Sequence, residues 1–95
     1  MLYVVHCIDR PGMEGVRAAA IQGHVAYLAT RPIKVVMSGP LTSDDGARVV
    51  GSFFIVEAPD RTAVEAFQAA DPLYQAGIWA TVDVRAFNKR VDNRD

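Results

Sequence analysis

The stretch that decides the fold is residues 49–58, VVGSFFIVEA, which we expect to form a long strand. Side chains along a strand alternate between the two faces of its sheet. One set here is Val49, Gly51, Phe53, Ile55 and Glu57, and the other is Val50, Ser52, Phe54, Val56 and Ala58. Both sets are mainly apolar, whereas a face open to water should be mostly polar. We therefore expect both faces of this sheet to be covered.

The rest of the sequence contains three more strand-like segments and two helix-like segments, separated by residues typical of turns. Further strands are expected at residues 2–9, 33–37 and 78–87, and a helix is expected at residues 13–30. A second helix should open at Asp60, or at a capping box of Thr62 and Glu65, and end at Asp71-Pro72. The order βαββαβ predicts an α+β, ferredoxin-like fold, a four-stranded antiparallel sheet with two helices on one face.

The second face of the predicted sheet needs a cover other than the helices. Each large apolar side chain left in water would forgo about 1.5–3 kcal/mol and promote aggregation. A second copy of the chain, packed sheet face to sheet face, meets this need with the least additional structure. The sequence therefore predicts a homodimer in which the two sheets form a closed, barrel-like sandwich. The alternation alone does not say which set of side chains faces the helices.

Length and composition exclude several classes of protein. Ninety-five residues with 51% hydrophobic and 22% charged side chains are typical of one globular domain, which we expect to span residues 1–95 with a frayed tail at residues 88–95. Ten basic and eleven acidic residues give a net charge of −1, so no nucleic-acid partner is expected. No apolar run is long enough for a membrane span, and a cytoplasmic protein without membrane contact is predicted.

His24 and Asp71 are the first candidates for chemistry. His24 shares a helical stripe with Ile21, Val25 and Leu28, so it should face the sheet, either as a core histidine with one backbone partner or as a general acid or base. Asp71 either merely terminates the second helix or pairs with an imidazolium, because a helix C-terminus disfavours a carboxylate. A bond between the two would fix the tautomer of the ring and raise its basicity.

Two further features point to a binding pocket. Ser38, Gly39 and Pro40 follow a predicted strand; they are either a simple bend or a pocket wall in which Gly39 admits a ligand and Ser38 supplies a hydroxyl. Arg17 lies two turns before His24 on roughly the same helix face. Its guanidinium is either a solvated charge or the holder of an anionic substrate group.

The remaining chemistry-bearing residues favour structural roles. His6 is interpreted as a packing histidine, and Cys7 as a buried soft hydrophobe, although a nucleophile is the alternative. A single cysteine excludes an internal disulfide and a cysteine-rich zinc site. The sequence has no phosphate loop, nucleophile elbow or metal-ligand spacing. We therefore expect no metal and no cofactor.

These residues give the chain a resemblance to the YCII-related (YciI-like) family of small bacterial proteins. The matching fragments run in order from the first strand to the last: Tyr3-Val4-Val5, Asp9, His24-Val25-Ala26-Tyr27-Leu28, Ser38-Gly39-Pro40-Leu41, Gly51-Ser52, Asp71-Pro72, Ala76-Gly77 and Phe87. The resemblance implies a dimeric α+β barrel similar in fold to muconolactone isomerase. It also implies an active site in which the family histidine, aspartate and serine fall on His24, Asp71 and Ser38.

Some members of the family are linked to dehydrochlorination of chlorinated hydroxyquinones. The resemblance therefore favours a small enzyme that uses a His/Asp acid–base dyad for isomerisation or elimination on a small molecule, without a cofactor. Two positions depart from the family pattern: Ile21 stands where relatives often have arginine, and Leu73 stands where an aromatic residue usually follows Asp-Pro. Both bear on the pocket, so the substrate of a relative does not transfer directly.

Two other functions are compatible with the sequence. One is a non-catalytic module that binds or senses a small metabolite in the same pocket, which predicts stabilisation by a ligand without product formation. The other is a haem- or oxygen-handling enzyme on the same dimeric barrel, which the lack of an obvious dedicated ligand disfavours.

Overall fold

Glycines in the left-handed region separate the elements where the sequence predicts turns. In the computed structural model, which describes residues 1–94, Gly12, Gly46 and Gly77 have φ values of 76°, 74° and 70°. Glycine adopts this conformation without the steric cost that a Cβ atom imposes. The elements are β1 (Leu2–Asp9), α1 (Glu14–Ala29), β2 (Lys34–Thr42), β3 (Val49–Glu57), α2 (Arg61–Ala69), α3 (Pro72–Gln75) and β4 (Trp79–Phe87).

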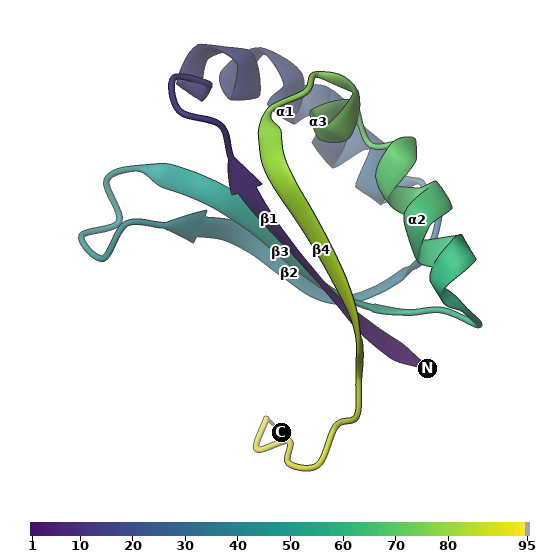
Figure 1. The fold of residues 1–95 in the computed structure, drawn as a ribbon. Coiled ribbons are helices and arrows are strands. Elements are labelled where there is room, and N and C mark those ends of the chain that lie inside the picture. The colour runs from purple at the N-terminus through teal and green to yellow at the C-terminus, as the bar shows by residue number, and fades with distance from the viewer. Residues whose placement is uncertain (95) are drawn as a thin grey trace.

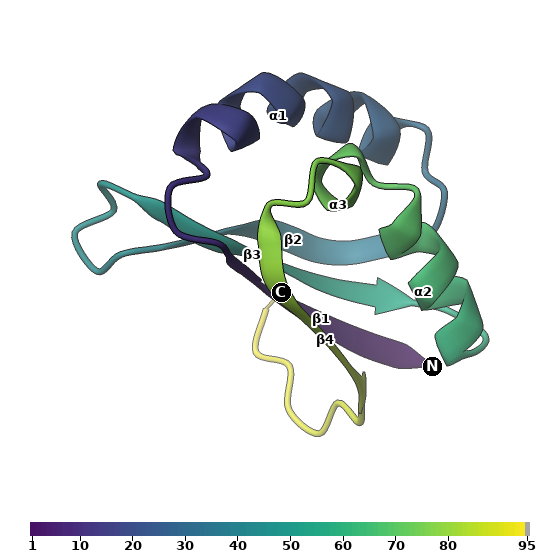
Figure 2. The same ribbon diagram turned by 45° about the horizontal axis from the view of Figure 1, so that its top comes forward.

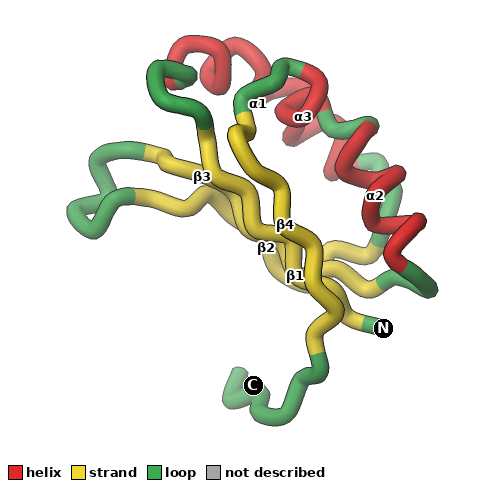
Figure 3. The backbone as a smooth tube through the Cα atoms, viewed as in Figure 1, coloured by secondary structure: helices red, strands yellow, loops and turns green. Residues whose placement is uncertain are grey.

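The four strands form one antiparallel sheet in the order β2-β3-β1-β4. All three helices cover the same face, and the other face carries only the C-terminal tail (Figures 1 and 2). Figure 3 shows the same division into a helical layer and a strand layer. The predicted ferredoxin-like fold is confirmed.

Strand β2 is longer than the sequence predicts, and this changes the place of a candidate site. The expected end at residue 37 is wrong, because β2 runs on to Thr42 and holds Ser38, Gly39 and Pro40 within it. Glycine and proline weaken a strand in general, but β2 is an edge strand, where proline is tolerated. Irregular register on both sides of this segment accompanies the extension.

The second predicted helix is divided in two. Asp60 caps α2 through its side chain, which accepts a hydrogen bond from the Ala63 amide at 2.9 Å, so the first of the two expected caps is confirmed. Helix α2 ends at Ala69, and a short helix α3 begins at Pro72. Proline suits the first position of a helix because its missing N–H has no partner there in any case.

The structure determines which side chains face the helices. The buried core comes from alternate residues of β1 and β3, from α2 and α3, and from β4 and the residues that flank β3 and β4: Tyr3, Val5, Cys7, Phe54, Val56, Ala58, Val64, Phe67, Leu73, Ile78, Trp79 and Val84. Trp79 is also buried in this core, although the alternation of side chains along β4 would place it on the face away from the helices. The register of β1 and β4 shifts between Ile8 and Asp9, and the indole packs against Phe54 and Tyr74.

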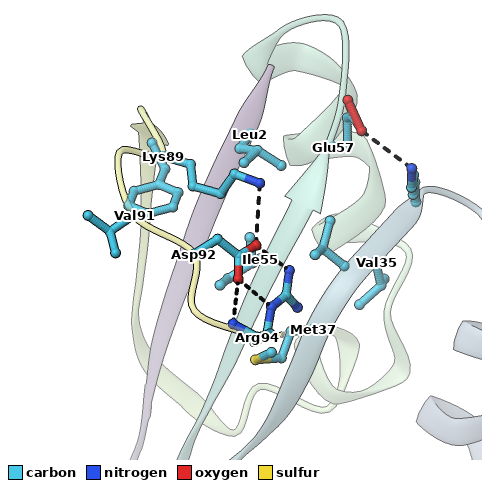
Figure 4. Close-up of a pocket in the computed structure, with 12 residues that line it drawn as sticks. Leu2, Val35, Met37, Ile55, Glu57, Lys89, Val91, Asp92 and Arg94 are labelled. Carbon is cyan, nitrogen blue, oxygen red and sulfur yellow. Dashed lines mark hydrogen bonds and ion pairs between the residues drawn. The ribbon is translucent and has the colours of Figure 1, made fainter.

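The opposite face of the sheet has large apolar side chains in water. Met37, Phe87 and Ile8 are 47%, 41% and 38% exposed. The tail after β4 has no helix or strand through residue 94, and it lies against one end of this face, where Asp92 bonds to Lys89 and Arg94 (Figure 4). Among residues 1–94, no helix has the length and apolarity that crossing a membrane requires.

Candidate active site

Helix α1 brings His24 over the sheet next to Gly23, where α1 packs against α3. A Cβ atom added to Gly23 would lie 3.4 Å from two side-chain carbons of Pro72, so the glycine allows the two helices to approach. The imidazole of His24 packs edge-on against Phe54, with ring centroids 6.1 Å apart. The expectation that His24 faces the sheet agrees with this geometry.

The His24 ring is held by the carboxylate of Asp71. Nδ1 of His24 lies 2.9 Å from both Oδ1 and Oδ2 of Asp71. An ionised carboxylate can only accept hydrogen bonds, so Nδ1 carries the proton. In the neutral ring Nε2 then bears the lone pair. Among the described residues Nε2 has no protein partner, and the ring is available to a ligand on that side.

Asp71 occupies a different local position from the one the sequence indicates. It is the N-cap of α3, not the last residue of a long second helix, and its Oδ1 accepts a hydrogen bond from the Leu73 amide at 2.9 Å. The expectation that Asp71 needs a positive partner because it ends a helix therefore does not apply, since a helix N-terminus favours a carboxylate. Its charge is stabilised by the α3 amide and by His24, although the side chain is fully buried.

Arg17 is bound to Asp9 and Ser52, two residues that no sequence pattern marks as part of the site. Its Nε and Nη2 donate to the two carboxylate oxygens of Asp9, both at 2.9 Å, and Nη2 also donates to Ser52 Oγ at 2.9 Å. Two parallel bonds of this kind hold a guanidinium in one orientation. In the sequence, Ser52 is the one hydroxyl residue of the apolar strand β3, and Asp9 is the acidic residue that ends β1. Neither feature by itself indicates that Arg17 is the partner.

A pocket of about 200 Å³ lies between α1 and strands β2 and β3. Its lining includes five of the six candidate site residues, His24, Arg17, Ser38, Gly39 and Pro40, together with Ile21, Val25, Ser52 and Phe54. The sixth candidate, Asp71, lies behind the ring of His24. The structure thus brings all six candidates together. The pocket that they surround has the volume of a site for one substituted ring.

The β2 residues form the wall of this pocket opposite α1. Ser38 is paired in register with Phe54 and Pro40 with Ser52, which are the positions on the helix-covered side of the sheet. Ser38 is exposed, and its hydroxyl has no hydrogen-bond partner among the described residues. A ligand in the pocket would find a hydroxyl donor on this wall and the imidazole on the other.

Cys7 lies in the core beneath the same residues and is shielded from solvent. Burial, followed by the charges of Asp71 and Asp9, raises the pKa of the Cys7 thiol from 9.0 to about 12, against an opposing effect of Arg17. A thiol with so high a pKa is a poor nucleophile, which agrees with the structural interpretation of Cys7. Burial and Asp71 also raise the pKa of Tyr27, whose hydroxyl donates to the Phe67 carbonyl at 2.8 Å.

His6 is remote from the pocket, because it belongs to the opposite face of the sheet. Its ring packs edge-on against Phe53 with centroids 6.4 Å apart, in agreement with a packing histidine. Within residues 1–94, no group of three or more histidine, cysteine, aspartate or glutamate side chains is placed to hold a metal ion.

The fold and the pocket define a ferredoxin-like α+β protein with a His–Asp pair, of which the aspartate is buried, beside a small cavity. The family model of the YCII-related domain matches residues 1–88. The chain belongs to the YCII-related family, as the resemblance predicted. No curated protein matches it.

Several solved structures are similar to this chain. The 5-chloro-2-hydroxyhydroquinone dehydrochlorinase (TftG) from Burkholderia phenoliruptrix AC1100, in complex with 2,5-dihydroxybenzoquinone, is 34% identical over 93% of this chain and 94% of its own, with a TM-score of 0.84. An antibiotic biosynthesis monooxygenase is 16% identical over 94% of this chain and all of its own, with a TM-score of 0.56. Rv0793 from Mycobacterium tuberculosis is 13% identical over 96% of this chain and 97% of its own, with a TM-score of 0.53. The last two share the fold only.

Proposed function

We propose that this chain is a small enzyme in which His24 and Asp71 act as an acid–base dyad on a small molecule, by isomerisation or elimination. One observation carries the proposal: a carboxylate holds Nδ1 of an imidazole that lines a pocket and keeps Nε2 unpartnered. This is the arrangement in which a neutral histidine accepts a proton and the carboxylate stabilises the imidazolium that forms.

The proposed reaction needs only proton transfer. Nε2 of His24 removes a proton from the substrate, and the electron pair of the broken bond shifts into the substrate. In an elimination this pair expels a leaving group such as chloride, with net loss of HX. In an isomerisation the imidazolium returns the same proton to another carbon. Both outcomes balance without an oxidant or a reductant.

The other pocket residues would bind the substrate and stabilise its charge. The Ser38 hydroxyl, on the wall opposite His24, would donate to an oxygen on which negative charge develops. Gly39 and Pro40 would shape this wall around the ring. Arg17 would present Nη1, the guanidinium nitrogen not engaged by Asp9 or Ser52, to an anionic oxygen.

The similarity to the dehydrochlorinase favours a hydroxylated six-membered ring as substrate. At 34% identity over nearly the whole of both chains, a protein in complex with 2,5-dihydroxybenzoquinone supports a related compound here. A pocket of about 200 Å³ agrees with one substituted ring. Elimination is thus the first reaction to test. We also propose that the enzyme is a homodimer that uses the apolar face of the sheet.

The test is turnover of 5-chloro-2-hydroxyhydroquinone by the purified chain, followed as chloride release, with exchange of substrate hydrogen in D₂O followed by mass spectrometry. We expect His24→Ala to lower the rate by about 10²–10⁴. His6→Ala is the matched control, because it removes a histidine from the other face of the sheet, and it should retain the rate.

Two results would contradict the proposal. The first is full activity of His24→Ala. The second is stabilisation of the wild type by hydroxyquinones with neither chloride release nor hydrogen exchange, which would indicate the metabolite-binding module instead.

A further inference from the structure

A second cavity of about 420 Å³ continues from the pocket of about 200 Å³ beside His24, which we call the ring pocket. The two cavities share Arg17, Ile21 and Pro40 as lining residues. The second cavity, which we call the hairpin groove, extends past these residues toward the β2–β3 hairpin. It is about twice the volume of the ring pocket. A ligand seated beside His24 therefore has free space in one direction.

The walls of the hairpin groove are mainly apolar. Ala18 contributes from α1, and Ala47 and Val49 contribute from the hairpin and the start of β3. Val49 is 36% exposed, although it belongs to a strand. Small and aliphatic side chains on both walls would contact an apolar ligand and offer it few hydrogen bonds.

The hairpin that forms one wall is closed by its own hydrogen bonds. The Ser43 amide donates to the Arg48 carbonyl at 2.9 Å, and the Arg48 amide donates to Ser43 Oγ at 3.1 Å. The Ala47 amide donates to Asp45 Oδ1 at 3.0 Å. The wall is thus held in place before a ligand arrives, which lowers the ordering cost of binding.

The charges in the groove do not favour a charged occupant. Glu14 and Arg48 both line it, and no salt bridge joins either of them to another described residue. The guanidinium of Arg17 is paired with Asp9, and its remaining nitrogen, Nη1, serves the ring pocket in the proposed function. An acidic group would be attracted by Arg48 and repelled by Glu14, and a basic group would meet the reverse.

We propose that the hairpin groove is a subsite for an apolar alkyl or aryl substituent on the ring that the His24 pocket binds. The inference rests on the proposed function for the ring and adds the class of substrate, a hydroxylated ring with an uncharged hydrophobic arm. The substituent would leave the ring pocket between Ile21 and Pro40 and lie between Ala18 and Val49.

The test measures the affinity of 2,5-dihydroxybenzoquinone and its 3-methyl, 3-propyl and 3-hexyl derivatives by calorimetry. We expect the affinity of the wild type to rise about two- to fourfold for each added methylene, the range for partial to full burial of a CH₂ group. Ala18→Trp, which fills the groove, should remove this rise and leave the dissociation constant of the parent quinone unchanged. Ala26→Trp, on the same helix outside both cavities, should retain the rise.

The outcomes separate the groove from the ring site. Equal affinities across the series, with the parent quinone still bound, would overturn the subsite and leave the proposed function intact. A rise with chain length that persists in Ala18→Trp would also overturn it, because the arm would then bind elsewhere. Failure of every quinone to bind would overturn both the subsite and the ring site.

Discussion

Nδ1 of His24 lies 2.9 Å from each carboxylate oxygen of Asp71, across 47 positions of sequence. The contact depends on the short helix α3, which packs against α1 where Gly23 meets Pro72. One oxygen of Asp71 also caps α3 through the Leu73 amide, so a single side chain both begins a helix and orients the imidazole. A change at Asp71 can therefore be divided into an effect on stability and an effect on chemistry.

Asp71→Asn should separate these two effects. Asparagine caps helices about as well as aspartate, so α3 should persist. The loss of a charge-assisted bond to His24 should lower the free energy of unfolding by about 1–2 kcal/mol. The rate should fall by about 10²–10⁴, because the amide no longer stabilises the imidazolium. Urea unfolding and chloride release measure the two quantities.

Asp60→Asn is the matched control, because Asp60 caps α2 through the same kind of bond and lies away from the pocket. We expect it to change the free energy of unfolding by less than about 0.5 kcal/mol and the rate not at all. If Asp71→Asn kept the wild-type rate, Asp71 would have only the capping role.

Most of the fold could be predicted because its signals are local. Alternating apolar residues in β3, the Asp60 cap and the turns at Gly12 and Gly46 each depend on a few neighbouring residues. The extension of β2 through Gly39 and Pro40 could not be predicted, because it depends on β2 being an edge strand, which is a property of the assembled sheet.

The candidate site likewise has features that the sequence predicts and features that depend on the assembled fold. Helical spacing places His24 toward the sheet, and the position of Asp71 after the second predicted helix suggests an imidazolium partner, which the resemblance to the family supports. The bond between Arg17 and Asp9 was missed because it joins the end of β1 to α1, and spacing within one helix does not report on it. The cap of α3 was missed because Asp71-Pro72 reads equally as the end of one helix or the start of another.

Asp9→Asn should destabilise the protein by about 3 kcal/mol. The Asp9 and Arg17 side chains are each only 10% exposed, and removing one charge leaves the other buried without compensation. Urea unfolding at neutral pH measures the loss. Glu65→Gln is the control: its bond to Arg61 joins side chains of α2 that are 58% and 52% exposed, so a change below about 0.5 kcal/mol is expected. Equal effects of the two substitutions would mean that the Asp9 pair is effectively solvated.

The Cys7 thiol should make stability depend on pH above about 9. The pKa of Cys7 is about 12 in the folded chain and close to 9.0 in the unfolded chain, so between these values only the unfolded thiol loses its proton. The unfolded state then binds fewer protons, and the free energy of unfolding falls as pH rises, by up to about 1.4 kcal/mol per pH unit. From about pH 8.5 to about pH 10 this amounts to roughly 1 kcal/mol.

Urea unfolding of wild type and Cys7→Ala over this range measures the effect. The alanine variant should be less stable at neutral pH, because it leaves a small cavity, but its stability should fall by about 1 kcal/mol less over the alkaline range. Parallel curves for the two proteins would show that the thiol ionises equally in both states.

The exposed apolar face of the sheet should bind a second copy of the chain. Phe53 lies on this face beside His6 and outside the cavity that the C-terminal tail borders. Phe53→Glu would place a charge in the proposed interface, where a buried carboxylate without a partner is costly. By sedimentation, the wild type should have twice the 10.3 kDa mass of one chain, and Phe53→Glu should be a folded monomer. Val16→Glu, which adds the same charge to an exposed valine of α1, should remain dimeric. A monomeric wild type would contradict the dimer and leave the apolar face without its expected cover.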